Sequence, residues 1–387
     1  MTCRFTNTKN PNYLNIAEFA DVHLGHNRTT ATQIIESLHH ALPNNPETAA
    51  LDLIIYAGDV FDRLITLPTK EVVTEVEIWA IDYLKLCKKH DIETVIVEGT
   101  PRHDRKQCYL FEHLNELYGI GAKVLYVQRL SVVKLERFNL SILFVPDEWH
   151  PDHQETYRQA VQAVAQAGID KPDLAVMHGA FDYQFPANLD IPTHDSDLYL
   201  QLVREWIFIG HVHVHSRKER ILVSGSLDRL TFGEESPKGH IRVKCRGNGY
   251  EGDEVTFVEN PLAQRYDTID VEGLTLDQVA VDVAAKDMPK GSNLRLLCAK
   301  TDPAFFAEKQ IQATFPTFRI VVSAKKVKTQ VSTQVDPLTP RRRVTPVDIS
   351  PSNVKRLMAA RLAERDLLPD AQASERVLAL MDGVING

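Results

Sequence analysis

Short apolar runs alternate with amphipathic helical stretches over residues 1–262. Two of the helical stretches are Val72–His90 and Thr156–Ala167. The apolar runs predict buried strands, each followed by a loop, at Leu14–Phe19, Leu51–Tyr56, Glu93–Val97, Val124–Val127, Ser141–Val145, Leu174–Met177 and Trp206–Ile209. Strands that alternate with helices indicate an α/β or a layered α+β domain. Because ligands of such sheets bind beyond the carboxyl ends of the strands, the residues after each strand are where a site is expected.

The pattern changes after residue 262. A small α/β module is predicted there. Its strands are expected at Asp267–Val271, Leu294–Lys300 and Phe318–Ser323, and its helices at Leu276–Ala285 and Pro303–Phe315. Residues 331–349, rich in proline and arginine, predict an extended linker. Residues 350–387 contain two short amphipathic helices, which are too small to fold alone. They either pack back on the body or dock on a partner protein, and we favour docking.

Composition narrows the class of protein. A chain of 387 residues is long enough for two or three domains. No apolar run approaches the eighteen or so residues that a membrane span needs, and the first twelve residues contain no signal-peptide core. Five scattered cysteines predict free thiols. We therefore expect a cytoplasmic protein without a membrane partner, and its net charge of −8 disfavours broad DNA binding by this chain alone.

Residues with metal-binding side chains follow five of the predicted strands. They are Asp21 and His23, Asp59, His103 and Asp104, His178, and His211 and His213. A single Asp or His after a strand is usually a turn or cap residue. Five such positions in one domain, each in the loop after an apolar strand, are hard to explain as ordinary loops. The sequence therefore predicts a metal centre where the ends of these strands meet.

These residue types suit a pair of divalent cations. Two cations roughly 3.5–4 Å apart hold the attacking and leaving oxygens of a phosphoryl displacement. Such a pair needs one bridging carboxylate and further nitrogen and oxygen ligands, a mixture that suits Mn²⁺ better than Mg²⁺. A further histidine that is not a ligand can protonate the leaving oxygen.

The series D-x-H, GD-x-x-D, G…HD, HG and GH-x-H resembles the calcineurin-like metallophosphoesterases. Within them, the stretches ADVHLG, AGDVFD and LVSGSLDRLTFGEE are similar to those of the SbcD-type nuclease subunit, the partner of the coiled-coil ATPase SbcC. The resemblance implies an α+β fold: a layered β-sandwich flanked by helices, with a small α/β cap domain and C-terminal helices. The expected parts are a nuclease domain (1–262), a DNA-binding cap (263–330), a linker (331–349) and an ATPase-binding helical segment (350–387).

The resemblance also implies a role for each residue. Asp21, His23 and His213 would bind the first of two Mn²⁺ ions per chain. Asp59 would bridge the ions, and His178 and His211 would bind the second. His103 would be the acid near the scissile phosphate, with Asp104 orienting its other ring nitrogen.

The chain departs from the family pattern in the stretch Gly99–Asp104, which lacks the usual asparagine ligand. Either Thr100 supplies a weaker oxygen there, or water does. A dication would repel Arg102, so we expect Arg102, with Arg105 and Lys106, to face a DNA phosphate.

The function that we expect is that of a Mn²⁺-dependent DNA exonuclease and endonuclease, a homodimer bound to an SbcC-like ATPase. The alternatives are a metallophosphoesterase acting on nucleotides or phosphoproteins, and a non-catalytic scaffold of the ATPase complex.

Overall fold

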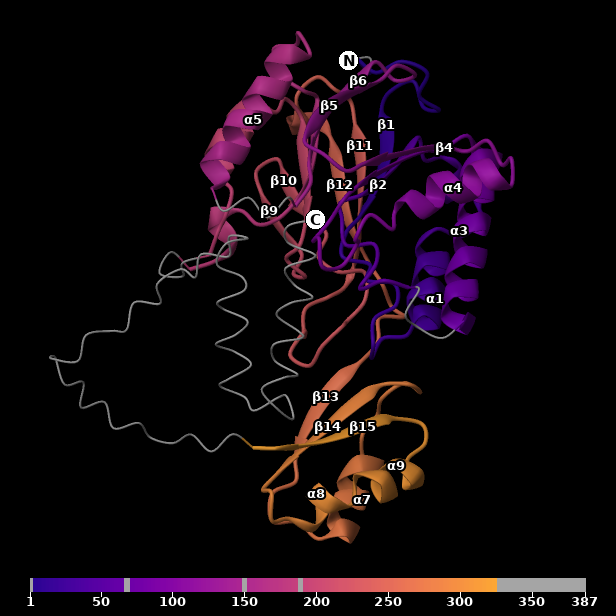
Figure 1. Ribbon diagram of the computed structural model, residues 1–387, viewed down its shortest axis with the longest axis vertical. Coiled ribbons are helices and arrows are strands. Elements are labelled where there is room, and N and C mark those ends of the chain that lie inside the picture. Colours follow the sequence, from indigo (N-terminus) through magenta and orange to yellow (C-terminus); the bar gives the residue numbers. More distant parts are fainter. Residues whose placement is uncertain (1–2, 66–69, 148–151, 187–190, 326–387) are drawn as a thin grey trace, which may run out of the picture. The chain divides into compact units, whose positions relative to one another are not determined.

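The computed structural model describes residues 3–65, 70–147, 152–186 and 191–325 (Figure 1). The first sheet has the strand order β12-β11-β1-β2-β3-β4. Its four parallel strands are β1 (Leu14–Phe19), β2 (Leu53–Tyr56), β3 (Glu93–Val97) and β4 (Lys123–Val127). Two antiparallel strands, β11 (Gly239–Cys245) and β12 (Glu254–Glu259), extend the sheet beyond β1.

The second sheet has the order β5-β6-β7-β8-β10-β9. Its parallel strands are β6 (Leu140–Val145), β7 (Leu174–His178), β8 (Trp206–Gly210) and β10 (Ile221–Val223). Antiparallel strands β5 (Ser131–Leu135) and β9 (Ser216–Lys218) close its two edges. All seven strands predicted for residues 1–262 are present, with ends shifted by two residues at most, whereas β5 and β9–β12 were not predicted.

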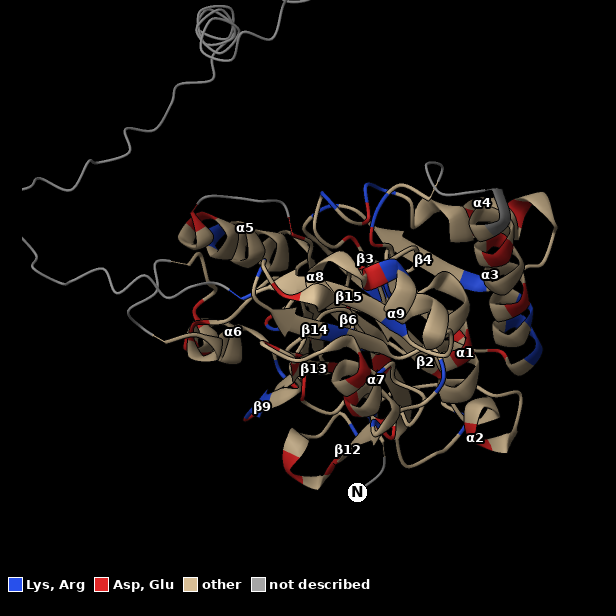
Figure 2. Ribbon diagram, turned by 90° about the horizontal axis from the view of Figure 1, so that it is seen from below, with Lys and Arg blue, Asp and Glu red and all other residues tan. Residues whose placement is uncertain are grey.

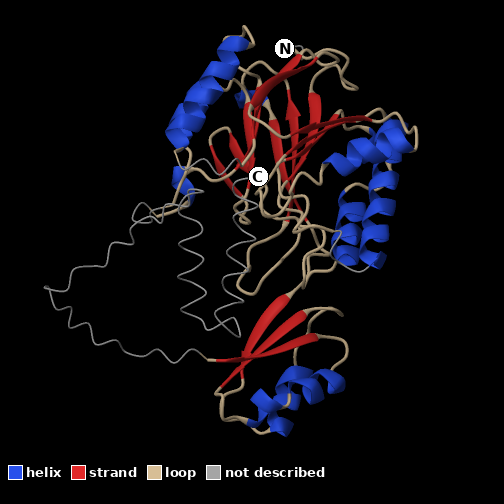
Figure 3. Ribbon diagram, viewed as in Figure 1, coloured by secondary structure: helices blue, strands red, loops and turns tan. Residues whose placement is uncertain are grey.

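Alternation of side chains along the strands builds a layered core. In β1, Leu14 and Ile16 point to the layer between the two sheets, and Ala17 and Phe19 point to the other face. That other face packs against helices α1 (Ala31–Ala41), α3 (Lys70–His90) and α4 (Tyr109–Leu117). Helices α5 (His153–Gln166) and α6 (Ser196–Leu202) cover the outer face of the second sheet. The described fold is thus mixed α/β, with two large sheets flanked by helices (Figure 3).

The loops at the carboxyl ends of the strands are bonded to one another. The Asp21 N–H donates to the carbonyl of Gly58 over 3.1 Å, and the Gly179 N–H donates to the carbonyl of Gly210 over 3.0 Å. A Cβ atom at Gly210 would lie 2.3 Å from the carbonyl oxygen of Ala57, in the other sheet. Only glycine therefore allows the two sheets to approach each other here, where the predicted site residues lie.

A third sheet of three parallel strands, β13 (Tyr266–Asp270), β14 (Asn293–Cys298) and β15 (Arg319–Ala324), forms a module with its own apolar core. Helix α7 (Leu276–Ala284) lies where a helix was expected. The prediction of a single helix over residues 303–315 is wrong, because the segment forms two helices, α8 (Pro303–Phe306) and α9 (Glu308–Thr314). The break comes at Ala307, whose N–H bonds three residues back to Ala304 and whose φ of −107° leaves the helix.

Several predictions stay untested by the fold. The linker 331–349 and the helical segment 350–387 lie outside the described residues. Among the residues that are described, no helix is long and apolar enough to cross a membrane.

Figure 2 shows Lys and Arg interspersed with Asp and Glu, with basic stretches in the loop that joins β3 to α4.

Candidate metal centre

Four of the six predicted ligands have a backbone conformation that residues other than glycine rarely adopt. The angle φ is 49° at Asp21, 55° at His23, 49° at Asp59 and 107° at His211. Such conformations cost about 1–3 kcal/mol each, and they persist only where the surroundings hold them. Here the hydrogen bonds between neighbouring loops do so, including the one from the His23 N–H to the Asp59 carbonyl at 3.0 Å. Strained residues of this kind cluster at functional sites.

The structure brings all six predicted ligands together with His103, in three overlapping groups. Within each group the candidate ligand atoms lie within 4.8 Å of one another. The groups are Asp21, His23 and His213; His23, Asp59 and His103; and Asp59, His178 and His211. Asp21, His23, Asp59 and His178 are buried, and His211 is exposed.

Three of the histidines have an oxygen close to Nδ1, and two of them are held there by a hydrogen bond. The Nδ1 atom of His178 donates to the Ala57 carbonyl over 2.7 Å. That of His213 lies 3.1 Å from a Glu234 carboxylate oxygen, and that of His23 lies 3.2 Å from an Asp62 carboxylate oxygen. At His178 and His213 the hydrogen bond at Nδ1 fixes the tautomer and leaves Nε2 with a lone pair for a metal ion. The buried Nδ1 of His23 lies within ion-pair distance of Asp62 but makes no hydrogen bond to a described residue.

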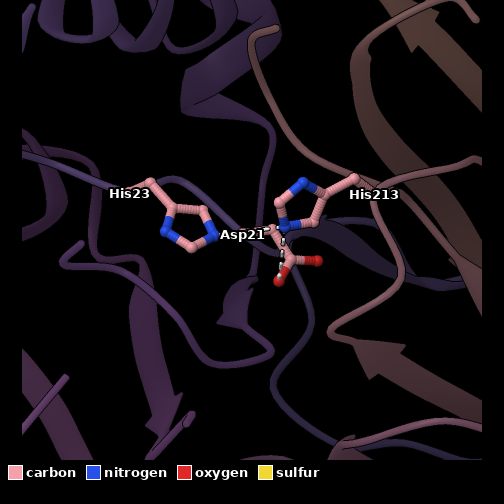
Figure 4. A group of neighbouring side chains, drawn as sticks. All are labelled: Asp21, His23 and His213. Carbon is pink, nitrogen blue, oxygen red and sulfur yellow. Dashed lines mark hydrogen bonds and ion pairs between the residues drawn. The ribbon is translucent and has the colours of Figure 1, made fainter. Parts of the chain in front are cut away.

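Figure 4 shows the side chains of the first group, Asp21, His23 and His213. The Nε2 atoms of His23 and His213 face each other at 3.2 Å, and Nε2 of His213 lies 3.9 Å from Asp21 Oδ1. Two facing nitrogen lone pairs repel each other unless a proton or a cation lies between them. The Asp21 carboxylate is itself fixed by the His211 N–H, at 2.9 and 3.0 Å from its two oxygens. Two imidazoles and a carboxylate form a donor set that could hold a divalent cation.

Asp59 is shared by the second and third groups. Its Oδ2 atom is 3.3 Å from His178 Nε2 and 3.9 Å from His23 Nε2. Burial alone would raise the pKa of Asp59, but the facing imidazole of His178 lowers it overall. Burial likewise disfavours the charge on His178, yet Asp59 raises the pKa of His178 to about 10. The carboxylate is therefore kept ionised and ready to hold a cation, which would displace the imidazole proton.

His103 lies beside these residues, with its ring edge-on to His23 at 4.8 Å between centroids. Its Nδ1 donates to the main-chain carbonyl of Asp62 over 2.6 Å. The prediction that Asp104 orients His103 is wrong: Asp104 is fully buried and accepts hydrogen bonds from the Phe61 and Gly99 N–H groups. Asp104 thus shapes the loop, and burial, with the nearby charge of Asp59, raises its pKa to about 8.

Glu234 contacts the site but was not among the predicted site residues, although it lies in the stretch LVSGSLDRLTFGEE. Its carboxylate contacts His213 Nδ1 and pairs with Lys238 Nζ, 3.1 Å away. Burial alone would lower the pKa of His213, but the hydrogen bond to Glu234 and the charge of Asp21 raise it. An acidic residue that follows a histidine pair by about twenty positions gives no signal of this contact in the sequence.

The predicted DNA-contacting residues Arg102, Arg105 and Lys106 are all exposed on the loop that also carries His103. Arg105 and Lys106 have φ angles of 47° and 61°, and the Lys106 N–H donates to the Glu98 carboxylate. The loop therefore presents positive charge next to the candidate metal centre.

No protein-family profile and no curated protein matches the chain. Solved structures do match. One of them, a crystal structure, is 11% identical; the match covers 64% of this chain and 99% of the other, with a TM-score of 0.39. A similarity this low carries no argument about function, which rests on the geometry described above.

Proposed function

We propose that this chain is a Mn²⁺-dependent phosphodiesterase of the calcineurin-like metallophosphoesterase type, and that it cleaves DNA. The observation that carries the proposal is the convergence of imidazoles and carboxylates from five strand ends. The two buried imidazoles, those of His23 and His178, each have an oxygen beside Nδ1. A pair of divalent cations there supplies Lewis acidity and a nucleophile at neutral pH.

The chain's own residues have separate tasks in such a reaction. Because Nδ1 of His103 donates to the Asp62 carbonyl, Nε2 is the ring atom left for substrate. In its protonated form the ring would give the Nε2 proton to the leaving oxygen and return to the neutral form. The His103 side chain is 31% exposed and so open to substrate. The exposed cations of the same loop, among them Arg105, attract a polyanionic backbone. This favours DNA over a small monoester.

The partners follow from the resemblance and belong to the same proposal. We propose that residues 350–387 bind an SbcC-like ATPase and that two copies of the chain form a dimer. The overall negative charge of −8 supports the idea that a partner supplies much of the DNA affinity.

The test compares metal content with cleavage. Protein equilibrated with Mn²⁺ should contain two ions per chain and cleave a labelled DNA hairpin and a chromogenic phosphodiester in preference to a monoester. Asp59→Ala should lose both ions and all cleavage, because it removes the carboxylate shared between the groups, whereas His103→Ser should keep the ions and lose cleavage. Asp82→Ala and His113→Ser, at exposed positions on α3 and α4, are the matched controls.

The alternatives give other results. Preference for a monoester would identify a phosphatase, and wild-type protein with one ion or none and no cleavage would identify a scaffold. Normal cleavage by His103→Ser would show that the acid is another residue.

A further inference from the structure

Thr100 lies beside the candidate metal ligands at the carboxyl end of β3. Its hydroxyl donates to Asp59 Oδ2 over 3.1 Å, and the hydroxyl oxygen of Thr100 also lies 3.3 Å from His178 Nε2. These two ligand atoms are themselves 3.3 Å apart. The Thr100 oxygen, the Asp59 oxygen and the His178 nitrogen thus form a nearly equilateral triangle.

The size of this triangle suits one face of a coordination shell. Ligands with bonds of about 2.1 Å lie roughly 3.0 Å apart around an octahedral ion and roughly 3.4 Å apart around a tetrahedral one. A hydroxyl has one donor and two acceptor lone pairs. Thr100 can therefore keep its hydrogen bond to Asp59 and still offer a lone pair to an ion in front of the triangle.

The position of Thr100 does not depend on its hydroxyl. Its backbone N–H donates to Asp59 Oδ1 over 2.6 Å, and the residue is only 6% exposed. A side chain of the same shape without the hydroxyl keeps that backbone contact. The loss of the oxygen can thus be separated from damage to the loop.

We propose that the Thr100 hydroxyl oxygen is a ligand of the cation held by Asp59, His178 and His211, and that this position fills second. The proposal rests on the proposed function, since it presupposes the cation pair. Charge sets the order of filling. The group that contains Asp21 has a carboxylate of its own and lies near Asp59, whereas the group that contains His178 has only Asp59 and adds a neutral hydroxyl.

The experiment is a titration of metal-free protein with Mn²⁺, followed by electron paramagnetic resonance of the free and bound ion, without any cleavage assay. Wild type should bind one ion tightly and a second more weakly, with the signal of a coupled pair at saturation. Thr100→Val should keep the first step and weaken the second on the order of 10–100-fold. Thr100→Ser, which restores the oxygen, should recover the second step.

A matched control removes a different buried hydroxyl. Thr94 lies on β3, the strand that leads into the Thr100 loop, and its hydroxyl bonds Tyr83, away from the candidate ligands. Thr94→Val should therefore bind both ions as wild type does. Unchanged binding by Thr100→Val would overturn the proposal. Equal weakening of both steps would also overturn it, because it would show that Thr100 acts only by orienting Asp59.

Failure of the proposed function has a different signature. If wild type binds no Mn²⁺, the cation pair is wrong and Thr100 has no ion to bind. If wild type binds two ions in sequence and Thr100→Val loses the second, but no DNA is cleaved, the role of Thr100 stands and the nuclease proposal falls.

Discussion

Replacing Glu234 by glutamine tests the charge network behind the candidate metal centre. The carboxylate accepts from the Leu230 N–H at 3.0 Å, contacts His213 Nδ1 and pairs with Lys238. The Lys238 side chain is fully buried, and its other partners are the His213 carbonyl at 2.8 Å and the Ser226 hydroxyl at 2.9 Å. Glu234→Gln leaves this buried ammonium without a counter-charge.

The expected loss of stability follows from the pKa of Glu234. Burial alone would raise it, but the hydrogen bond from His213 and the charge of Lys238 lower it from 4.5 to about 2. At about 1.4 kcal/mol per pH unit, the ionised carboxylate stabilises the fold by about 3 kcal/mol. Because the folded-state pKa is depressed, this stabilisation is complete above pH 4.5 and is lost as the pH falls toward 2.

The assay is urea unfolding of metal-free protein at pH 7, followed by tryptophan fluorescence. Glu234→Gln should lower the free energy of unfolding by about 3 kcal/mol, in line with the cost of breaking a buried ion pair. Glu235→Gln, at the exposed neighbouring position, should change it by less than about 0.5 kcal/mol. The double variant that combines Glu234→Gln with Lys238→Met should lose less stability than the sum of the losses of the two single variants. Additive losses, or a Glu234→Gln protein as stable as wild type, would refute the reasoning.

Two further predictions concern the loop after β3 and a buried histidine. Gly99→Ala should destabilise the fold by about 2 kcal/mol and impair Mn²⁺ binding, because the added Cβ would lie 2.1 Å from the backbone nitrogen of Asp59. Thermal melting and Mn²⁺ titration check this, and an unchanged melting temperature and Mn²⁺ affinity would contradict it. Burial and the nearby Arg242 lower the pKa of His240 to about 3, so between pH 6.5 and 3 only the unfolded state takes up that proton. On acidification, the free energy of unfolding of wild type should therefore fall more steeply than that of His240→Gln, the slopes differing by up to about 1.4 kcal/mol per pH unit. Urea unfolding from pH 7 to 5 measures both slopes, and equal slopes would show that His240 does not titrate in this way.

The sequence predicted the buried strands well because their signal is local. Runs such as Leu14–Phe19 and Glu93–Val97 are apolar on both faces, which is what a strand between two packed layers requires. The strands that were not predicted lie toward sheet edges or are only three residues long. In β12 (Glu254–Glu259), for example, exposed and half-buried side chains alternate without a continuous apolar run.

The candidate site divides in the same way. The types and order of its residues were visible because each follows a strand, and parallel strands bring their carboxyl ends to one edge. The contacts that fix those residues were not visible. It is the main-chain carbonyl of Asp62 that holds Nδ1 of His103, the task predicted for Asp104.

The sequence alone therefore determined where seven of the strands in residues 1–262 form and which side chains follow them, because apolar runs and strand ends depend on neighbours in the chain. Only the tertiary structure decided which atoms face one another. Glu234 reaches His213 across 21 residues, and Thr100 reaches His178 across 78. Such distances along the chain are closed by the packing of two sheets, and a hydrogen bond depends on ångströms that no sequence pattern specifies.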